Sequence, residues 1–187
     1  MIRARTVSRR YGAHVALHET DFDLREGELV ALVGRNGAGK STLLSVLSVL
    51  AGALVPSTGT VERGVPTGWA PQRPALYSRL TPRENVELFA RLARAPGTDV
   101  DLPDRPAADL SVGQRQRLNL ALAFLGEPRA LLLDEPTAAL DDDRRAELWQ
   151  RVAALCADGG AVVFATQLHE ETERADRVVQ LHGGHVE

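Results

Sequence analysis

The stretch Gly34-Arg35-Asn36-Gly37-Ala38-Gly39-Lys40-Ser41 decides how the rest of this sequence is interpreted. It fits the pattern G-x-x-x-x-G-K-[ST]. An apolar run of strand length precedes it (28–34), and leucines at helical spacing follow it (41–54). Its three glycines allow the backbone N–H groups to turn inward around phosphate oxygens, and a helix N-terminus adds unpaired donors. The context therefore predicts a phosphate-binding loop rather than a glycine-rich turn without function.

The residue types in this loop suit a nucleotide phosphate chain. Lys40 is expected to reach the β- and γ-phosphates, and the Ser41 hydroxyl is expected to hold Mg²⁺. The residues expected to bind nucleotide are Gly34, Arg35, Asn36, Gly37, Ala38, Gly39, Lys40, Ser41 and Thr42.

Composition limits the class of protein. The 187 residues suffice for one domain with a real core, and a net charge of −3 gives no indication of nucleic-acid binding. The single cysteine excludes an internal disulfide, which suits a reducing compartment. The longest apolar stretch (43–55) is too short to span a bilayer, and no apolar segment follows the basic N-terminus to make a signal peptide. We expect a cytoplasmic chain that reaches a membrane only through a partner.

Strand-like and helix-like segments alternate along most of the chain, which predicts an α/β fold with a mostly parallel sheet and helices on both faces. Strands are expected at 2–7, 15–24, 60–62, 65–70, 130–133, 161–165, 177–181 and 185–186, and helices at 41–54, 82–93, 111–125, 141–158 and 170–175. We expect one domain, with a nucleotide-binding core (1–72 and 111–187), an antiparallel N-terminal β subdomain inside it, and a short helical subdomain (73–110).

Polar side chains at two strand ends suggest a second part of the site. Asp134 follows four apolar residues and so ends a strand, where ligands of open α/β sheets gather. Its carboxylate can hold Mg²⁺ through waters, and Glu135 can act as general base toward a water. Gln72 also ends a strand near the same edge, and an uncharged amide there could orient water and touch Mg²⁺, although its spacing alone is weak support for that role. The alternative is a solvated pair of acids.

Two further features point to a nucleotide. Ser111 and Gln114 form a capping pair at a second helix N-terminus, another favourable anion site. One nucleotide rarely needs two distant helix ends, so a nucleotide shared between two copies of the chain is a simple solution; the alternative is an ordinary capped helix. Tyr11 can stack on a base, or it can pack at a sheet edge.

The motifs at 34–41, 72, 110–114, 131–135 and 139–141 resemble the Walker A, Q-loop, signature, Walker B and D-loop of the ABC ATPases. They occur in the family's order, and the resemblance covers nearly the whole chain. It implies a nucleotide-binding domain of the P-loop NTPase fold that dimerises head to tail, with two ATP molecules and Mg²⁺ between Walker A of one copy and the signature of the other.

The resemblance also implies a role for particular positions. Tyr11 would stack on adenine, and Asp141 would lie at the dimer interface. The implied catalytic residues are Glu135, Gln72 and Gln167; the implied metal ligands are Ser41, Gln72 and Asp134; the implied phosphate contacts across the dimer are Ser111, Gly113 and Gln114.

The chain departs from the family's pattern at three places. Val112 stands where the family usually has a small residue, and Gln167 stands at the position of its switch histidine, with His169 as an alternative two residues on. Gln167 cannot carry charge, so we expect weak or partner-dependent hydrolysis. Only 37 residues separate Gln72 from Leu110, which predicts a reduced groove for a membrane partner. The candidates for that groove are Arg73, Tyr77 and Leu80.

The leading hypothesis is the ATPase subunit of a membrane transporter, a homodimer or heterodimer held to the cytoplasmic face of the membrane by a transmembrane permease. Its compact form is similar to subunits of haem-exporter or other exporter-type systems. The alternatives are a soluble ABC ATPase outside transport and a poorly hydrolysing, ATP-dependent regulatory dimer. No nucleic-acid partner is expected.

Overall fold

The computed structural model describes residues 1–48 and 55–187. A three-stranded antiparallel sheet has the order β2-β1-β4 and consists of β1 (Ile2–Tyr11), β2 (His14–Leu24) and β4 (Thr58–Arg63). β1 is longer than the sequence pattern predicts, because Tyr11 pairs with His14 and moves the turn to Gly12 and Ala13. Cross-strand pairing, not local composition, sets this strand end.

The second sheet has the order β5-β6-β7-β3-β8-β9. Its strands are β3 (Leu29–Val33), β5 (Thr67–Ala70), β6 (Ala130–Asp134), β7 (Ala161–Ala165), β8 (Arg177–His182) and β9 (His185–Val186). The first five are parallel, and β9 pairs antiparallel with β8. Every residue of β6 and β7 is buried, as expected for central parallel strands covered on both faces.

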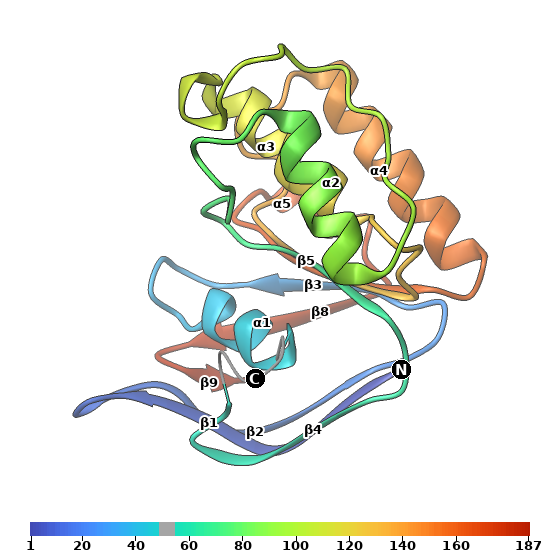
Figure 1. Cartoon of the computed structure of the whole chain (residues 1–187). Helices are drawn as coiled ribbons and strands as arrows, with labels where there is room; N and C mark the ends of the chain where they lie inside the picture. The colour runs from blue at the N-terminus through green and yellow to red at the C-terminus, as the bar shows by residue number, and fades with distance from the viewer. Residues whose placement is uncertain (49–54) are drawn as a thin grey trace.

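The helices are α1 (Lys40–Ser48), α2 (Pro82–Ala93), α3 (Val112–Ala123), α4 (Asp142–Ala157) and α5 (His169–Thr172), with a 3₁₀ turn η1 (Ala107–Asp109). α1 lies between the two sheets, and α2, α3 and α4 lie on the opposite side of the parallel sheet (Figure 1). The core divides accordingly: one apolar cluster surrounds α1, and another packs α3 and α4 against the other face. The predicted α/β fold is confirmed.

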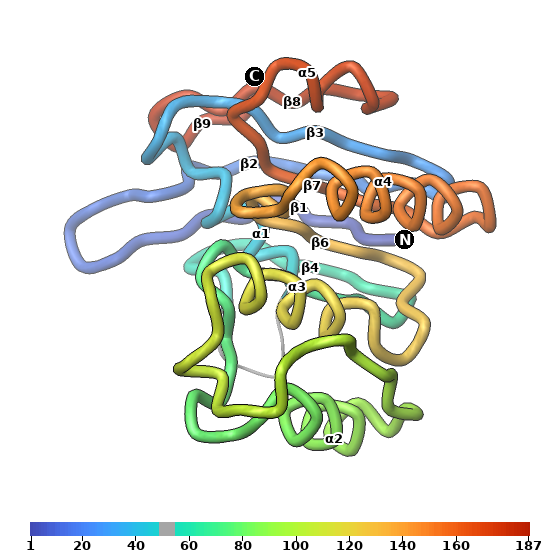
Figure 2. Tube along the Cα trace, turned by 90° about the horizontal axis from the view of Figure 1, so that it is seen from above, coloured from blue at the N-terminus to red at the C-terminus, as the bar shows by residue number. Residues whose placement is uncertain are grey.

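The helical segment after β5 contains α2 and η1, and a small apolar cluster joins α2 to α3. Thr81 caps α2 in a capping box with Glu84, and Pro82 is its first residue, as the sequence predicts. The tube in Figure 2 shows α2 beside α3 at one side of the fold. α5 is shorter than predicted, and the predicted helix at 41–54 is described as far as Ser48, its remainder lying outside the described residues.

Candidate functional site: a nucleotide cradle at the carboxyl edge of the parallel sheet

The phosphate loop connects β3 to α1 and depends on glycine at two close approaches. Gly34 has φ +149° and Gly39 has φ +106°. A Cβ added at Gly34 would lie 2.3 Å from the carbonyl oxygen of Leu181, and one at Gly39 would lie 2.9 Å from that of Ala16. Ala38 also accepts a hydrogen bond from the Gly184 N–H at 3.0 Å. The loop is therefore held in one shape by β2 and by the turn between β8 and β9.

Lys40 fills the interior of this loop. The side chain is buried, and its Nζ donates to the carbonyl oxygens of Gly34 at 2.7 Å and Arg35 at 3.3 Å. No acidic residue lies in the first turn of α1. Lys40 is also the one lysine of the chain. A cation and the unpaired N–H groups of a helix N-terminus thus meet, which is an anion site of the kind predicted.

Asp134 ends β6 near this loop and is 3% exposed. Burial raises the pKa of its carboxyl group, while hydrogen bonds from the Ser41 hydroxyl and the Gln72 backbone N–H lower that pKa. Its Oδ1 is buried without a hydrogen-bond partner among the described residues. An unsatisfied buried carboxylate oxygen beside a serine hydroxyl is a donor set that fits Mg²⁺. Ser41 and Asp134 thus lie together, whereas Gln72 reaches Asp134 through its backbone N–H and its predicted side-chain contact with the metal stays a prediction.

Glu135 adopts φ +48°, which is uncommon for a residue with a side chain. Its backbone N–H donates to the carbonyl oxygen of Ala165 at 3.0 Å, which fixes the strand end. Its Oε1 accepts a hydrogen bond of 2.6 Å from Nε2 of Gln167. His169 instead lies in α5 with its Nδ1 3.4 Å from the Thr172 hydroxyl. Of the two switch candidates, the structure brings Gln167 to the acid.

Tyr11 lies at the tip of the β1–β2 hairpin and is 48% exposed. The guanidinium of Arg9 lies 4.8 Å from the centroid of its ring. Sequence reasoning did not single out Arg9, although residues two apart on a strand share a face and the spacing contained that signal. The cation covers the ring of the residue expected to stack on adenine.

The signature segment forms the N-terminus of α3. The Ser111 hydroxyl accepts from the Gln114 N–H at 3.2 Å, and the Gln114 side chain accepts from the Ser111 N–H at 2.9 Å. Val112 is 63% exposed at this end. A Cβ added at Gly113 would lie 2.7 Å from the carbonyl oxygen of Ala139, so the helix end packs directly on the D-loop. Both predicted capping partners are in place at the N-terminus of α3.

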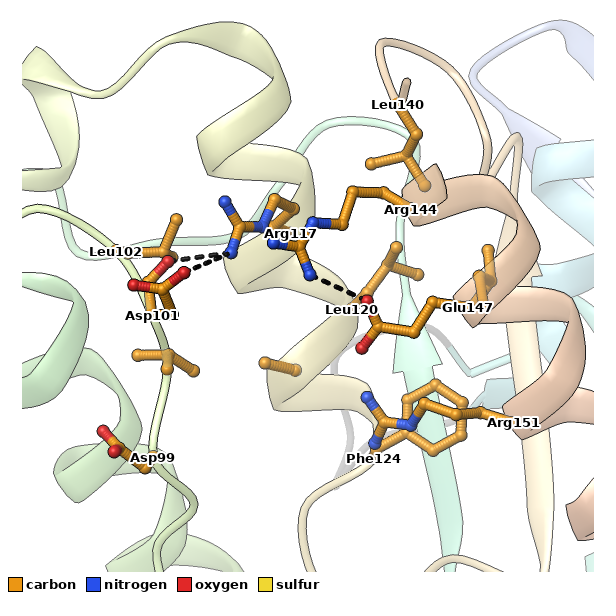
Figure 3. Close-up of a pocket in the computed structure, with 13 residues that line it drawn as sticks. Asp99, Asp101, Leu102, Arg117, Leu120, Phe124, Leu140, Arg144, Glu147 and Arg151 are labelled. Atoms are coloured by element: carbon orange, nitrogen blue, oxygen red, sulfur yellow. Dashed lines mark hydrogen bonds and ion pairs between the residues drawn. The ribbon is translucent and has the colours of Figure 1, made fainter. Parts of the chain in front are cut away.

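A cavity of about 270 Å³ lies away from these motifs, between α3, α4 and the loop at 99–102 (Figure 3). Two of its arginines pair with acidic side chains: a guanidinium nitrogen of Arg117 lies 3.7 Å from the Asp101 carboxylate, and Arg144 donates to Glu147 at 2.8 Å. The cavity holds none of the predicted site residues.

The fold and this site define an ATP-binding cassette, and comparison with known families agrees. The model of the ABC transporter family matches residues 17–138. The chain belongs to the ABC transporter family, and the sequence-based recognition is confirmed.

The relatives include ATP-binding proteins named for export, for drug resistance and for sulfate/thiosulfate import. The chain is 33% identical to the Nod factor export ATP-binding protein I of Rhizobium meliloti (strain 1021), covering 96% of this chain and 61% of that protein. It is 37% identical to the daunorubicin resistance ATP-binding protein DrrA3 of Streptomyces coeruleorubidus, covering 95% of this chain and 64% of that protein. It spans about three fifths of the length of these curated relatives.

Solved structures show the same fold. The dimeric structure of MJ0796, a bacterial ABC transporter cassette, has a TM-score of 0.87 and 26% identity, covering 100% of this chain and 97% of that one. A second structure of that cassette is a dimer in a post-hydrolysis state bound to ADP and Pi, with the same TM-score and coverage. Within residues 1–48 and 55–187, no helix is long and apolar enough to cross a membrane.

Proposed function

We propose that this chain is the ATP-binding and ATP-hydrolysing subunit of a membrane ABC transporter. The observation that carries the proposal is Asp134, a buried carboxylate next to the Ser41 hydroxyl and followed by Glu135, with one oxygen that has no hydrogen-bond partner within residues 1–48 and 55–187. Isolated burial of a charge is costly, so such a group is expected where a cation completes it. The ADP-bound structure of a similar cassette supports ATP as the substrate.

The site residues have separate roles in binding ATP and in its hydrolysis. Loop N–H groups and Lys40 hold the triphosphate, and Tyr11 stacks on the base. Ser41, Asp134 and Gln72 would hold Mg²⁺, which when bound would neutralise charge on the phosphates. Glu135 accepts a proton from the water whose oxygen attacks the γ-phosphorus, and the bond to the ADP oxygen breaks, giving ADP and phosphate. Gln167, already 2.6 Å from Glu135, orients that water.

The second half of each site comes from another copy or a related cassette. Ser111, Gly113 and Gln114 lie at the N-terminus of α3, and a dimeric cassette of the same fold supports this arrangement. Asp141, the N-cap of α4, lies at the same interface. The proposal is a head-to-tail dimer with two ATP molecules between the subunits.

A transmembrane permease is the proposed partner, and it would hold the cassette at the cytoplasmic face of the membrane. The segment after Gln72 offers a surface for it: Tyr77 is 53% exposed, and Arg73 is also exposed. Asn85 donates to the carbonyl oxygens of Tyr77 and Leu80 and so keeps this surface in one shape. Some relatives are named for export and others for import. They therefore support a role in powering transport but give no direction of transport.

The decisive experiment replaces Glu135 by Gln, which keeps the side chain's shape but removes the base. We expect hydrolysis to fall by about a hundredfold or more and an ATP-bound dimer to accumulate on gel filtration with Mg-ATP. Glu147→Gln makes the same chemical change on the surface of α4 and should behave like the parent. A Glu135→Gln protein that stays monomeric with Mg-ATP, or that hydrolyses at the parent rate, would contradict the proposal.

One observation favours a second candidate, an ATP-dependent regulatory dimer that hardly hydrolyses. The neutral amide of Gln167 occupies the Glu135 oxygen that would receive the proton. Such a regulator would dimerise with Mg-ATP but show no turnover, with or without membranes. Co-purification from detergent-solubilised host membranes separates the two, because a polytopic protein that stimulates hydrolysis is expected of a transporter motor.

A further inference from the structure

Two amide side chains are buried in the signature helix, on a face that is otherwise largely apolar. Gln116 is 5% exposed and Asn119 is 3% exposed, with Leu118 and Leu120 as neighbours. Nδ2 of Asn119 donates to the carbonyl oxygen of Pro71 at 2.9 Å and lies 3.4 Å from Oε1 of Gln116. Nε2 of Gln116 donates to the carbonyl oxygen of Pro136 at 2.9 Å.

The end points of this chain of hydrogen bonds lie beside the proposed metal and catalytic groups. The Pro71 carbonyl belongs to the same peptide group as the Gln72 N–H, and that N–H hydrogen-bonds to Asp134. The Pro136 carbonyl belongs to the residue that follows Glu135. The polar path thus leaves Asp134, crosses two amides of α3, and returns next to Glu135. Linked hydrogen bonds of this kind polarise and fix one another in a low dielectric.

The C-terminal end of α3 lies directly against the strand below it. A Cβ added at Gly68 of β5 would lie 1.9 Å from the carbonyl oxygen of Ala123, so the helix end rests directly on the strand. An apolar pair could fill the same space without directed bonds. Two buried amides each need a hydrogen-bond partner, so they permit one position of α3 relative to the strands. The helix is therefore fixed to β5 by close approach and to both strand ends by directed bonds.

We propose that Asn119, with Gln116 as its relay, is a positioning residue that keeps the Gln72 peptide, Asp134 and Glu135 in register with the signature helix. The inference rests on the proposed function and extends it. In the proposed dimer, Ser111 at the start of α3 contacts the nucleotide bound to the partner subunit. Two turns further along the same helix, Asn119 is hydrogen-bonded beside the groups that bind the nucleotide of its own subunit. A shift of one therefore displaces the other.

The test compares two buried asparagines in the Glu135→Gln background, where an ATP-bound dimer accumulates. Asn119→Leu removes the bond to Pro71. Asn85→Leu is the matched control: Asn85 is fully buried in α2 and donates to the carbonyl oxygens of Tyr77, Leu80 and Thr81, but it bonds neither strand end. Three quantities are measured: the melting temperature, metal-free ATP affinity of the monomer by fluorescent-nucleotide titration, and the dimer dissociation constant with Mg-ATP by sedimentation.

We expect both variants to have a lower melting temperature than the parent protein. Asn119→Leu alone should weaken the Mg-ATP dimer by about tenfold or more, with monomer ATP affinity within about twofold of the parent. Equal dimer constants for the two variants would overturn the inference, as would a parallel loss of metal-free ATP affinity. A Glu135→Gln parent that forms no dimer would instead overturn the proposed function.

If Asn119→Leu does not fold, a second variant tests the proposed positioning role. Gln116→Met keeps an unbranched side chain of similar length but removes the donor to Pro136. In the protein with Glu135 intact, it should lower kcat by about tenfold while KM for ATP stays within about twofold. A Gln116→Met protein with parental kcat would overturn the inference.

Discussion

The two helix N-termini of this cassette are built in opposite ways. At α1 the loop contains three glycines with positive φ, and the buried Lys40 donates to the loop carbonyls of Gly34 and Arg35. At α3 the end is capped by its own side chains, Ser111 and Gln114, with Val112 largely exposed. The N-terminus of α1 thus has its binding geometry before a ligand binds. The N-terminus of α3 is capped by its own side chains and faces outward.

The difference explains how one chain can hold two half-sites. A site that binds tightly in a single subunit must be rigid and must keep polar groups free for its ligand. The Asp134 oxygen that has no partner in the described part of the chain is such a group. A half-site that acts only on dimerisation is exposed to water in the monomer, and its N–H donors are then bonded to its own capping side chains. We therefore expect substitutions at α1 to act on the monomer and substitutions at α3 to act on the dimer.

The largest expected effect comes from Lys40→Ala. Removing the one buried cation of the cradle should lower the ATP affinity of the monomer by about a hundredfold or more, because charge-assisted contacts to phosphate are the strongest in the site. Isothermal titration with ATP measures it, and Ser111→Ala is the comparison, expected to leave monomer affinity unchanged. Equal losses in both variants would break the distinction between the two termini.

A tenfold-scale effect is expected at the other terminus. Gly113→Ala places a Cβ 2.7 Å from the Ala139 carbonyl oxygen, which is too close, so the D-loop must shift. The Mg-ATP dimer of the Glu135→Gln protein should weaken by about tenfold, with monomer ATP affinity retained. Sedimentation with and without Mg-ATP checks this. An unchanged dimer constant would show that the contact between α3 and the D-loop does not shape the half-site.

A smaller effect on stability is expected from Asp134→Asn in nucleotide-free protein. Burial raises the folded-state pKa of this carboxyl group, so its charged form opposes folding, and that penalty grows as pH rises above the ordinary aspartate pKa. The neutral amide should raise the melting temperature at pH 7 by about 2–4 °C. The gain should vanish near pH 3.5–4, where Asp134 is also protonated. A gain that persists at that pH would show a cause other than charge.

The smallest effect expected is that of Gln167→His. An imidazole at this position can carry charge beside Glu135, so kcat should rise by about threefold to tenfold, while Gln167→Ala should lower it. Steady-state hydrolysis at saturating Mg-ATP measures both, with His169→Ala as the control expected to leave the rate unchanged. If Gln167→Ala has no effect and His169→Ala slows hydrolysis, the assignment of the switch residue moves to α5.

Much of the fold follows from local signals in the sequence. The apolar runs that became β6 and β7, the capping boxes of α2 and α3, and the N-cap Asp141 of α4 lie where composition and spacing predict. Helix caps are predictable because each involves residues three apart in the chain. The end of β1 is not, because Tyr11 becomes a strand residue only by pairing with His14.

The sequence by itself determined the phosphate loop, the acids at the end of β6 and the order of motifs, because each is a short segment whose chemistry is fixed by neighbouring residues. Only the tertiary structure decided that Gln167, rather than His169, meets Glu135, and that Asn119 joins the signature helix to the Gln72 peptide. Those pairs are 32 and 48 residues apart. Their contact depends on which strands lie side by side in the parallel sheet and on the way α3 rests on Gly68, neither of which a local pattern encodes.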